Sequence, residues 1–180
     1  MPGKEEEISN KNKPEALVLV GMPGSGKSTW ARHHPKHYEI ASSDDFIKEC
    51  AKKEGKTYSE VFEKYSSQAR SAMKARVEGL IVARKPFIWD QTNLMKRERA
   101  GIYKLLHKTH KVVFVVFLVP LDVCRKNNEA RGKETGQFIE ESHFMKLAQA
   151  ATFPDESEPH DRIVRIIHPA WESKERTRLV

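Results

Sequence analysis

The sequence predicts an α/β fold, an open parallel β-sheet covered by helices on both faces. Short apolar runs alternate with longer amphipathic segments along the 180-residue chain. Each run is short enough for a buried strand, and the first and third end at a glycine and an aspartate, as strands of a parallel sheet do. The longest run, residues 112–120, falls well short of the roughly 20 residues that span a bilayer. Strands that alternate with helices form parallel sheets, because each helix returns the chain to the same edge.

The composition argues against a disordered protein and against a membrane protein. Hydrophobic residues make up 38% and charged residues 32% of the chain, as in folded soluble proteins. The net charge of +7 favours an anionic partner and gives no reason to expect a membrane. The charged N-terminus lacks the apolar core of a signal peptide, so we expect a cytoplasmic or nuclear protein. Cys50 and Cys124 lack the spacing of a zinc site and predict free thiols, and nothing indicates a particular oligomeric state.

The first half of the chain divides at its apolar runs. Residues 1–14 are polar and predict a disordered leader, followed by a folded domain over residues 15–170. A polar cluster from Ser42 to Asp45 supplies helix-capping residues. The elements expected here are a strand at 16–20, helices at 27–34 and 42–53, a strand at 38–41 and a long helix at 58–84.

The second half continues the alternation. Glycines at 132 and 136 predict a loop that separates two helices. The elements expected here are strands at 86–89, 112–119 and 163–167, and helices at 95–108, 121–131 and 138–151. Residues 171–180 are charged and predict a frayed tail. Ligands of such sheets bind beyond the carboxyl ends of the strands, so the site is expected there.

The strongest motif is the segment 21–28, GMPGSGKS, which matches GxxxxGK[ST] between an expected strand and an expected helix. Glycines let the backbone wrap a phosphate and point its N–H groups at the anion. Lys27 would contact the β- and γ-phosphates, and the Ser28 hydroxyl would ligate Mg²⁺. The sequence therefore predicts ATP and Mg²⁺ as cofactors; a loop that binds nucleotide without catalysis is the alternative. The expected nucleotide contacts are Gly21, Pro23, Gly24, Ser25, Gly26, Lys27, Ser28 and Thr29.

Carboxylates follow two of the expected strands. Asp44, after the second strand, would face the phosphate loop and accept a proton from an attacking hydroxyl. Asp44 or its neighbour Asp45 could equally cap the following helix. Asp90 ends the third strand, like the acid that holds Mg²⁺ or its waters in phosphate-loop proteins. Thr92 and Asn93 follow as polar groups at the lip of the site, although an ordinary turn with Asn93 as a cap is the alternative.

A basic run covers residues 125–133. Arginines and lysines on a helix pair that closes over ATP would neutralise charge that develops in the transition state. A solvated helix face is the default interpretation of such a run. From position alone, the two interpretations remain open.

Together these residues resemble the phage polynucleotide 5′-kinase family and its kinase-domain relatives in nucleic-acid repair. Residues 23–32 resemble that family's phosphate loop and the helix after it. Asp44 and Asp45 match its paired acids, of which the first is the general base. Residues 90–94, DQTNL, are similar to its D-x-T-N element. Arg131, with Gly132, matches the lid arginine that contacts the ATP phosphates.

The resemblance implies a P-loop NTPase sandwich with sheet order 2-3-1-4-5 and a helical lid over a kinase domain. It implies transfer of the ATP γ-phosphate to the 5′-hydroxyl of DNA or RNA, with nucleic acid as partner. The implied catalytic residues are Asp44, Lys27 and Arg131. The implied metal ligands are Ser28 and Asp90. The implied substrate contacts are Asp44, Asp45, Thr92, Asn93 and Lys48.

Two departures from the family pattern bear on the acceptor. Ile47, next to Lys48, stands where family members can carry an arginine for the substrate's terminal phosphate. Asn127 stands where a second lid arginine is expected. Arg70 and Arg97 are further candidates for contacts with backbone phosphates.

Other readings of the same motifs remain open. The spelling DQTN is also similar to the P-loop domain of heterogeneous nuclear ribonucleoprotein U-like proteins, which are nucleotide-dependent RNA binders. A small-molecule kinase of the zeta-toxin type would use the same loop with a different acceptor pocket. Asp44 separates the kinases from the binder, because binding alone has no need of a base.

Overall fold

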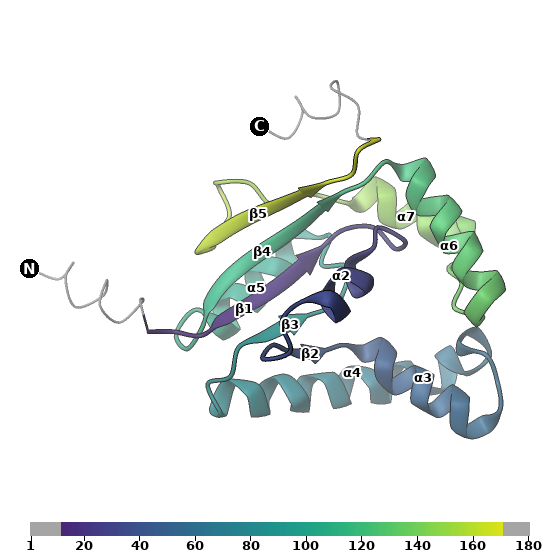
Figure 1. The fold of residues 1–180 in the computed structure, drawn as a ribbon, viewed down its shortest axis with the longest axis horizontal. Helices are drawn as coiled ribbons and strands as arrows, with labels where there is room; N and C mark the ends of the chain where they lie inside the picture. The colour runs from purple at the N-terminus through teal and green to yellow at the C-terminus, as the bar shows by residue number, and fades with distance from the viewer. Residues whose placement is uncertain (1–11, 171–180) are drawn as a thin grey trace, which may run out of the picture.

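The computed structural model describes residues 12–170, which form a five-stranded parallel sheet in the order β2-β3-β1-β4-β5 (Figure 1). The predicted strand order is thus confirmed. The strands are β1 (Glu15–Val20), β2 (Glu39–Ala41), β3 (Phe87–Trp89), β4 (Lys111–Leu118) and β5 (Arg162–Ile167). The helices are α2 (Lys27–His33), α3 (Ser43–Glu54), α4 (Tyr58–Val82), α5 (Lys96–Leu106), α6 (Leu121–Thr135) and α7 (Glu141–Ala150).

Both ends of the chain extend beyond the described part. The tail expected at 171–180, and residues 1–11 of the expected leader, lie outside it. The last residues of the leader segment already contact the domain. Lys13 Nζ donates to the His107 carbonyl at 2.9 Å, and the Pro14 carbonyl accepts from Lys111 N at 2.9 Å.

The central strand β1 carries the phosphate loop because it pairs on both sides. It lies parallel to β3, with Leu17 opposite Ile88, and parallel to β4, with Val18 opposite Phe114. All strands point the same way, so the segments that follow β1, β2 and β3 meet at one edge of the sheet. The sequence places GMPGSGKS, Asp44 and Asp90 in those segments.

Helices cover both faces of the sheet, which gives three layers. Residues of β1 alternate between the faces, as strand geometry requires. Ala16, Val18 and Val20 pack with Met73 and Val77 of α4 and with α5. Leu17 and Leu19 pack on the opposite face with Ala31 of α2.

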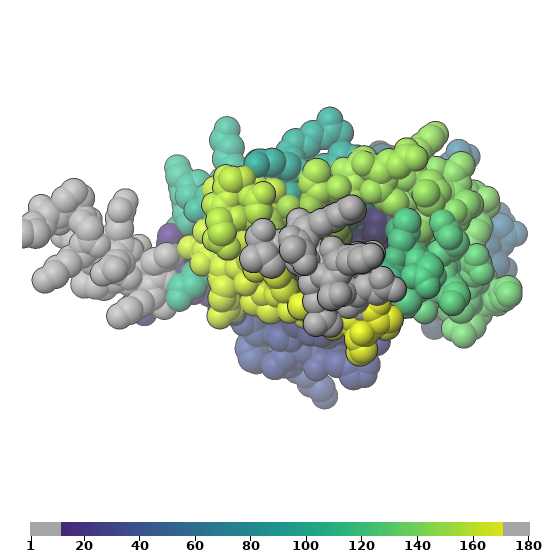
Figure 2. Space-filling view, turned by 90° about the horizontal axis from the view of Figure 1, so that it is seen from above, coloured from purple at the N-terminus to yellow at the C-terminus, as the bar shows by residue number. Residues whose placement is uncertain are grey.

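Two smaller apolar clusters lie beyond the carboxyl edge of the sheet. One joins α3 to α4 through Ile47, Ala51 and Val61. The other lies beneath α6 and α7 and contains Met22, Leu94, Cys124 and Phe144. The helix pairs α3/α4 and α6/α7 therefore stand on opposite sides of the strand ends (Figure 1). From above, the green segment of α6 and α7 lies beside the yellow C-terminal segment, with purple N-terminal atoms visible between them (Figure 2).

The loop expected at residues 132–136 is wrong. Helix α6 continues through Gly132 to Thr135 and ends at Gly136, which has φ 67°. Gly132 lies in the helix and packs closely on Phe138, since a Cβ there would be 3.0 Å from the Phe138 side chain. A helical glycine costs only about 1 kcal/mol relative to alanine, which close packing can offset. Helix α7 correspondingly begins at Glu141 rather than at 138.

A fully buried ion pair ties the region after β3 to the region after α7. Arg99 of α5 donates from Nε to Glu158 Oε2 at 2.9 Å, and both side chains are buried. Arg99 Nη1 also donates to the carbonyls of Asn93, at 3.0 Å, and Thr152, at 2.7 Å. Buried charges are tolerated when they are paired and hydrogen-bonded in this way. Among residues 12–170, none of the helices is long and apolar enough to cross a membrane.

Candidate active site

The phosphate loop joins β1 to α2 and depends on two glycines with positive φ. Gly24 has φ 80° and Gly26 φ 89°, a region that side chains disfavour. A Cβ on Gly24 would lie 2.2 Å from the Cys124 carbonyl oxygen, so α6 packs directly on the loop. The loop's base is fixed where Gly21 N donates to the Thr92 carbonyl at 3.0 Å. Backbone N–H groups at the start of α2 then form the ready-made anion site of a helix N-terminus.

Lys27 lies within this loop and is only 7% exposed. Its Nζ donates to the carbonyls of Gly21 and Met22, each at 2.8 Å. Burial lowers the pKa of Lys27 to about 8, while the nearby Asp90 carboxylate opposes the shift. The ammonium is therefore held at low dielectric where a phosphate would compensate its charge strongly.

Ser28 and Asp90 form an oxygen-rich pair at the end of β3. Ser28 acts on the Asp90 side chain, which is 9% exposed, and both residues line the same cleft. Burial raises the pKa of Asp90, whereas Ser28 and Lys27 hold it down. Hydroxyl and carboxylate oxygens suit Mg²⁺, which binds through one or two protein ligands together with substrate phosphates. Residues 12–170 contain no group of three or more His, Cys, Asp or Glu side chains that could hold a metal ion. A Mg²⁺ site completed by substrate phosphates does not need such a group.

Asp44 stands in the first turn of α3, and both of its carboxylate oxygens accept hydrogen bonds. Tyr58 Oη donates to Oδ1 at 2.8 Å, and Gln137 Nε2 donates to Oδ2 at 2.7 Å. The cap of α3 is Ser42, whose hydroxyl accepts from Asp44 N at 3.2 Å. The side chain of Asp44 is thus not the helix cap, and neither is the exposed Asp45.

Arg131 of α6 turns inward, so it does not belong to a solvated basic face. Its Nε donates to the Gln137 carbonyl at 2.9 Å, and its Nη2 donates to Asn128 Oδ1 at 3.0 Å. Burial lowers the pKa of Arg131, and the carboxylate of Asp44 opposes that shift. The positive charge of Arg131 also contributes to lowering the pKa of Lys27.

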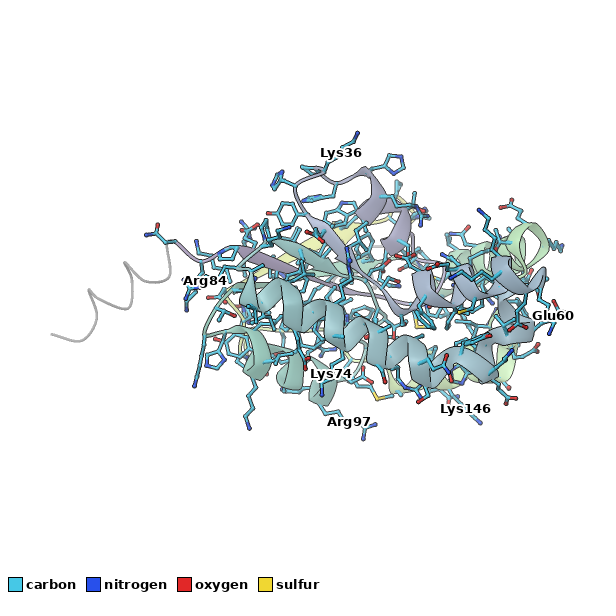
Figure 3. The ribbon with its side chains drawn as sticks, turned by 90° about the horizontal axis from the view of Figure 1, so that it is seen from below. Lys36, Glu60, Lys74, Arg84, Arg97 and Lys146 are labelled. Atoms are coloured by element: carbon cyan, nitrogen blue, oxygen red, sulfur yellow. The ribbon has the colours of Figure 1, made fainter. Side chains whose placement is uncertain are left out.

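A cleft runs between these elements. Its lining residues come from α2, β2, α3 and the end of β3: Ser28, Arg32, Ile40, Ser42, Asp45, Lys48 and Asp90. Four of them, Ser28, Asp45, Lys48 and Asp90, belong to the predicted site, and the structure brings them together. Arg70 and Arg97 do not line it; both are exposed, and Arg97 points away from the body (Figure 3).

The structure corrects the role expected for Asn93. Its side chain is 4% exposed and donates from Nδ2 to the Leu19 carbonyl at 2.8 Å. Its φ of 46° places it in the left-handed region, which asparagine tolerates better than most residues. Asn93 therefore braces the strand-end turn and is not available to a substrate. Thr92 contributes its carbonyl to the loop base, as described above for Gly21.

The remaining predicted loop residues have distinct surroundings. Pro23 and Ser25 are buried, and Ser25 N donates to the Met22 carbonyl at 3.1 Å. Thr29 is exposed on α2. Asn127, at the position expected for a second lid arginine, donates from Nδ2 to the Gly24 carbonyl at 2.8 Å. It links α6 to the loop directly.

Sequence reasoning missed Tyr58, Gln137 and Arg32. Tyr58 entered the prediction only as the first residue of the helix expected at 58–84, and Gln137 stood next to the wrongly expected loop. Arg32 lies in α2 four residues after Ser28. That spacing places the two side chains on the same face of the helix, and this signal could have identified Arg32 as a site residue.

Comparison with known proteins decides the family. Residues 17–154 match the family described as the AAA domain. The chain belongs to this family. A shikimate kinase of Clostridium botulinum is 31% identical over 141 residues, which cover 75% of this chain and 77% of that protein. Human heterogeneous nuclear ribonucleoprotein U-like protein 2 is 25% identical over 159 residues, 83% of this chain and 21% of that protein. The AAA-domain chain is thus a P-loop kinase with a nucleotide-binding loop.

Solved structures agree on the fold. A chain of the Pnkp1/Rnl/Hen1 RNA repair complex matches with 29% identity and a TM-score of 0.63, over 78% of this chain and 46% of that one. Chaetomium thermophilum Kti12 in complex with ADP-AlF3 matches with 17% identity and a TM-score of 0.64, over 91% and 94%. The AAA-domain chain spans about half of the RNA repair protein and about a fifth of the ribonucleoprotein.

Proposed function

We propose that this P-loop kinase transfers the γ-phosphate of ATP to the 5′-hydroxyl end of DNA or RNA. The observation that carries the proposal is the position of Asp44. Its carboxylate is held by two hydrogen bonds and acts electrostatically on Lys27 and Asp90, and although Asp44 does not itself line the cleft, its neighbour Asp45 does. This proximity to the phosphate loop and to the expected Mg²⁺ ligand supports Asp44 as the group that accepts a proton from the attacking hydroxyl.

The other residues would act on the nucleotide. The phosphate loop and Lys27 bind and orient the β- and γ-phosphates for in-line attack. Ser28 and Asp90 would hold Mg²⁺, which neutralises charge on the phosphates when it is bound. Arg131 stabilises the charge of the leaving phosphate from the lid, in the manner of an arginine supplied in cis.

A polynucleotide acceptor is supported by charge and by one relative. Arg32 and Lys48 both line the cleft, and neither makes an ion pair with any residue of the described chain. Asp45 and Asp90 line the same cleft, so the support from charge is the net +7 of the whole chain, which favours an anionic partner. Similarity to a protein of an RNA repair complex, at 29% identity, supports the same class. Work on nucleic-acid ends would place the protein in the cytoplasm or the nucleus.

A small-molecule acceptor is the second candidate. Its support is the 31% identity to a shikimate kinase over most of both chains. Such a substrate would bring its own hydroxyl to Asp44, and a carboxylate on it would satisfy the same two cations. The cleft chemistry is therefore shared, and the test must distinguish the acceptors.

The experiment measures transfer of labelled γ-phosphate from ATP, with Mg²⁺, to a panel of acceptors. The panel holds 5′-hydroxyl DNA and RNA oligonucleotides, nucleosides, shikimate and gluconate. Labelled oligonucleotide, with affinity that falls as salt is added, supports the proposal. Label only on a small molecule establishes the second candidate. ATP binding without label on any acceptor would move the assignment to a nucleotide-dependent RNA binder, the class suggested by the ribonucleoprotein relative.

A further inference from the structure

Asp44 is held by two side chains that come from distant parts of the chain. Tyr58 begins α4, and Gln137 follows α6; both are buried, with Gln137 only 6% exposed. Each donates to a different oxygen of the carboxylate, at 2.8 and 2.7 Å. Hydrogen bonds to a charged acceptor are the strong ones, and this pair restricts rotation of the carboxylate. Each oxygen keeps a further acceptor direction for a substrate hydroxyl.

Gln137 belongs to residues 136–138, the first part of the connection between α6 and α7, which is called the strap here. The strap is anchored on the first turn of α4 by Ser59. The Gly136 carbonyl accepts from Ser59 N at 3.2 Å and from Ser59 Oγ at 2.7 Å. Gly136 also packs against Thr57, since a Cβ there would lie 2.5 Å from the Thr57 Cβ. The lid, formed by α6, α7 and the strap, therefore rests on the first turn of α4, next to Tyr58.

The strap also contacts the arginine expected to meet ATP. Arg131 Nε donates to the backbone carbonyl of Gln137 at 2.9 Å, while the side chain of the same residue donates to Asp44. Gln137 thus contacts Arg131, on the nucleotide side of the site, through its backbone carbonyl. It contacts Asp44, on the acceptor side, through its side-chain amide. Any movement of Arg131 that carries the strap with it alters a hydrogen bond to Asp44.

We propose that Tyr58 and Gln137 are positioning residues for Asp44, and that Gln137 makes the orientation of this base depend on the closed lid. The inference rests on the proposed phosphoryl transfer with Asp44 as the base. Both act through the Asp44 carboxylate, to which they donate hydrogen bonds, so they are positioning rather than catalytic residues. With the lid displaced, Asp44 keeps only the bond from Tyr58, so the base is fully oriented only when α6 lies over the phosphate loop.

The test is a double-mutant cycle on turnover of the full chain. Gln137→Ala and Tyr58→Phe are each made in the wild type and in an Asp44→Ala background. Each single variant should lower kcat about 10- to 100-fold, because misplacement of a reacting group by an ångström has effects of that size. The KM for ATP should stay within about twofold, since the phosphate loop is untouched. In the Asp44→Ala background, neither substitution should lower kcat further.

Matched controls exist on the same elements. Tyr65→Phe removes a hydroxyl from α4 that donates to Glu54 rather than to Asp44. Gln149→Ala truncates an exposed glutamine of α7. Both controls should leave kcat unchanged. Tyr58→Phe keeps the buried ring, so it retains the packing of the α3/α4 cluster if Gln137→Ala proves unstable.

The outcomes separate the positioning role from the acceptor class. Unchanged kcat in both variants, or losses that add fully to that of Asp44→Ala, overturn the positioning role. A wild type that phosphorylates no oligonucleotide refutes the polynucleotide acceptor, and the cycle is then measured on the small molecule that it does phosphorylate. A wild type that phosphorylates nothing in the panel refutes both.

Discussion

The nucleotide half and the acceptor half of this site are built in different ways. The phosphate loop of the nucleotide half is one continuous segment, and Lys27 bonds to carbonyls only six and five residues earlier. The acceptor half is assembled from separate helices, since Asp44 bonds to partners 14 and 93 residues away. The loop therefore depends on other elements only where α6 and Thr92 contact it, whereas the hydrogen bonds of Asp44 depend on the packing of α3, α4 and the lid together.

This difference separates the expected effects of substitution. Changes in the loop should act on ATP affinity, because the loop contacts the phosphates in the ground state. Changes around Asp44 should act on turnover with ATP affinity preserved. The following experiments test that division, in order of decreasing effect.

Asp44→Asn should give the largest effect. The amide keeps the shape but cannot take a proton, and general-base catalysis is worth about 10²- to 10⁴-fold in rate. Turnover should fall by that factor, while the Kd for ATP measured by calorimetry stays the same. Asp45→Asn is the matched control, and it should lose far less. Retention of most activity by Asp44→Asn would show that Asp44 is not the general base.

Gly24→Ala should damage the nucleotide half. The new Cβ would sit 2.2 Å from the Cys124 carbonyl, in a backbone region that costs about 1–3 kcal/mol for other residues. The loop must then move off α6, and ATP binding should weaken by more than tenfold. Gly26→Ala shares the positive φ but meets nothing within 4 Å, so it should cost less. Equal losses of ATP affinity in the two variants would contradict the contact with α6.

ATP affinity should also depend on pH through Lys27. The pKa of its ammonium is lowered to about 8 by burial, and the protonated form is the one that binds phosphate. As pH rises through 8, affinity should therefore fall, approaching about tenfold per pH unit. In Lys27→Arg the guanidinium stays charged, so its weaker binding should be flat over the same range. A flat wild-type titration between pH 7 and pH 10 would argue against a depressed pKa at this position.

Asn127→Ala should have the smallest effect. It removes one exposed hydrogen bond from α6 to the Gly24 carbonyl, worth about 0.5–1.5 kcal/mol. ATP affinity should drop a few-fold, as measured by calorimetry, with kcat for bound ATP unchanged. Asn12→Ala, an exposed asparagine outside the site, serves as the control. Loss of turnover without loss of affinity would assign Asn127 to the acceptor half.

Most of the fold could be predicted because its elements are locally encoded. Residues 112–119 and the segment at 58–84 follow the periods of a strand and of a helix, and β4 and α4 form there. The order of the strands came from family resemblance, since periodicity does not state which strands pair. Gly132 misled the prediction because a glycine reads as a helix breaker. The contact with Phe138 that accommodates it inside α6 is tertiary.

The site was predictable to the extent that it is a motif. The phosphate loop carries its own signal, and Asp44 and Asp90 could be located as acids after strands. Tyr58 and Gln137 gave no signal, because a tyrosine at a helix start and a glutamine in a connection have ordinary local explanations. Asn93 looked like a polar group at the lip, yet its amide is turned into the fold, where the Leu19 carbonyl needs a donor.

The buried pair of Arg99 and Glu158 has a mechanical consequence for the lid. Arg99 also grips the Thr152 carbonyl, just after α7, and Thr152 N donates to the Leu94 carbonyl at 2.9 Å. Breaking a buried ion pair costs about 3–5 kcal/mol, more than the single hydrogen bonds that hold the strap. The lid is therefore held more strongly where α7 ends, at Thr152, than at the strap. When the lid opens, we expect the strap to move away from α4 while the segment at Thr152 stays in place.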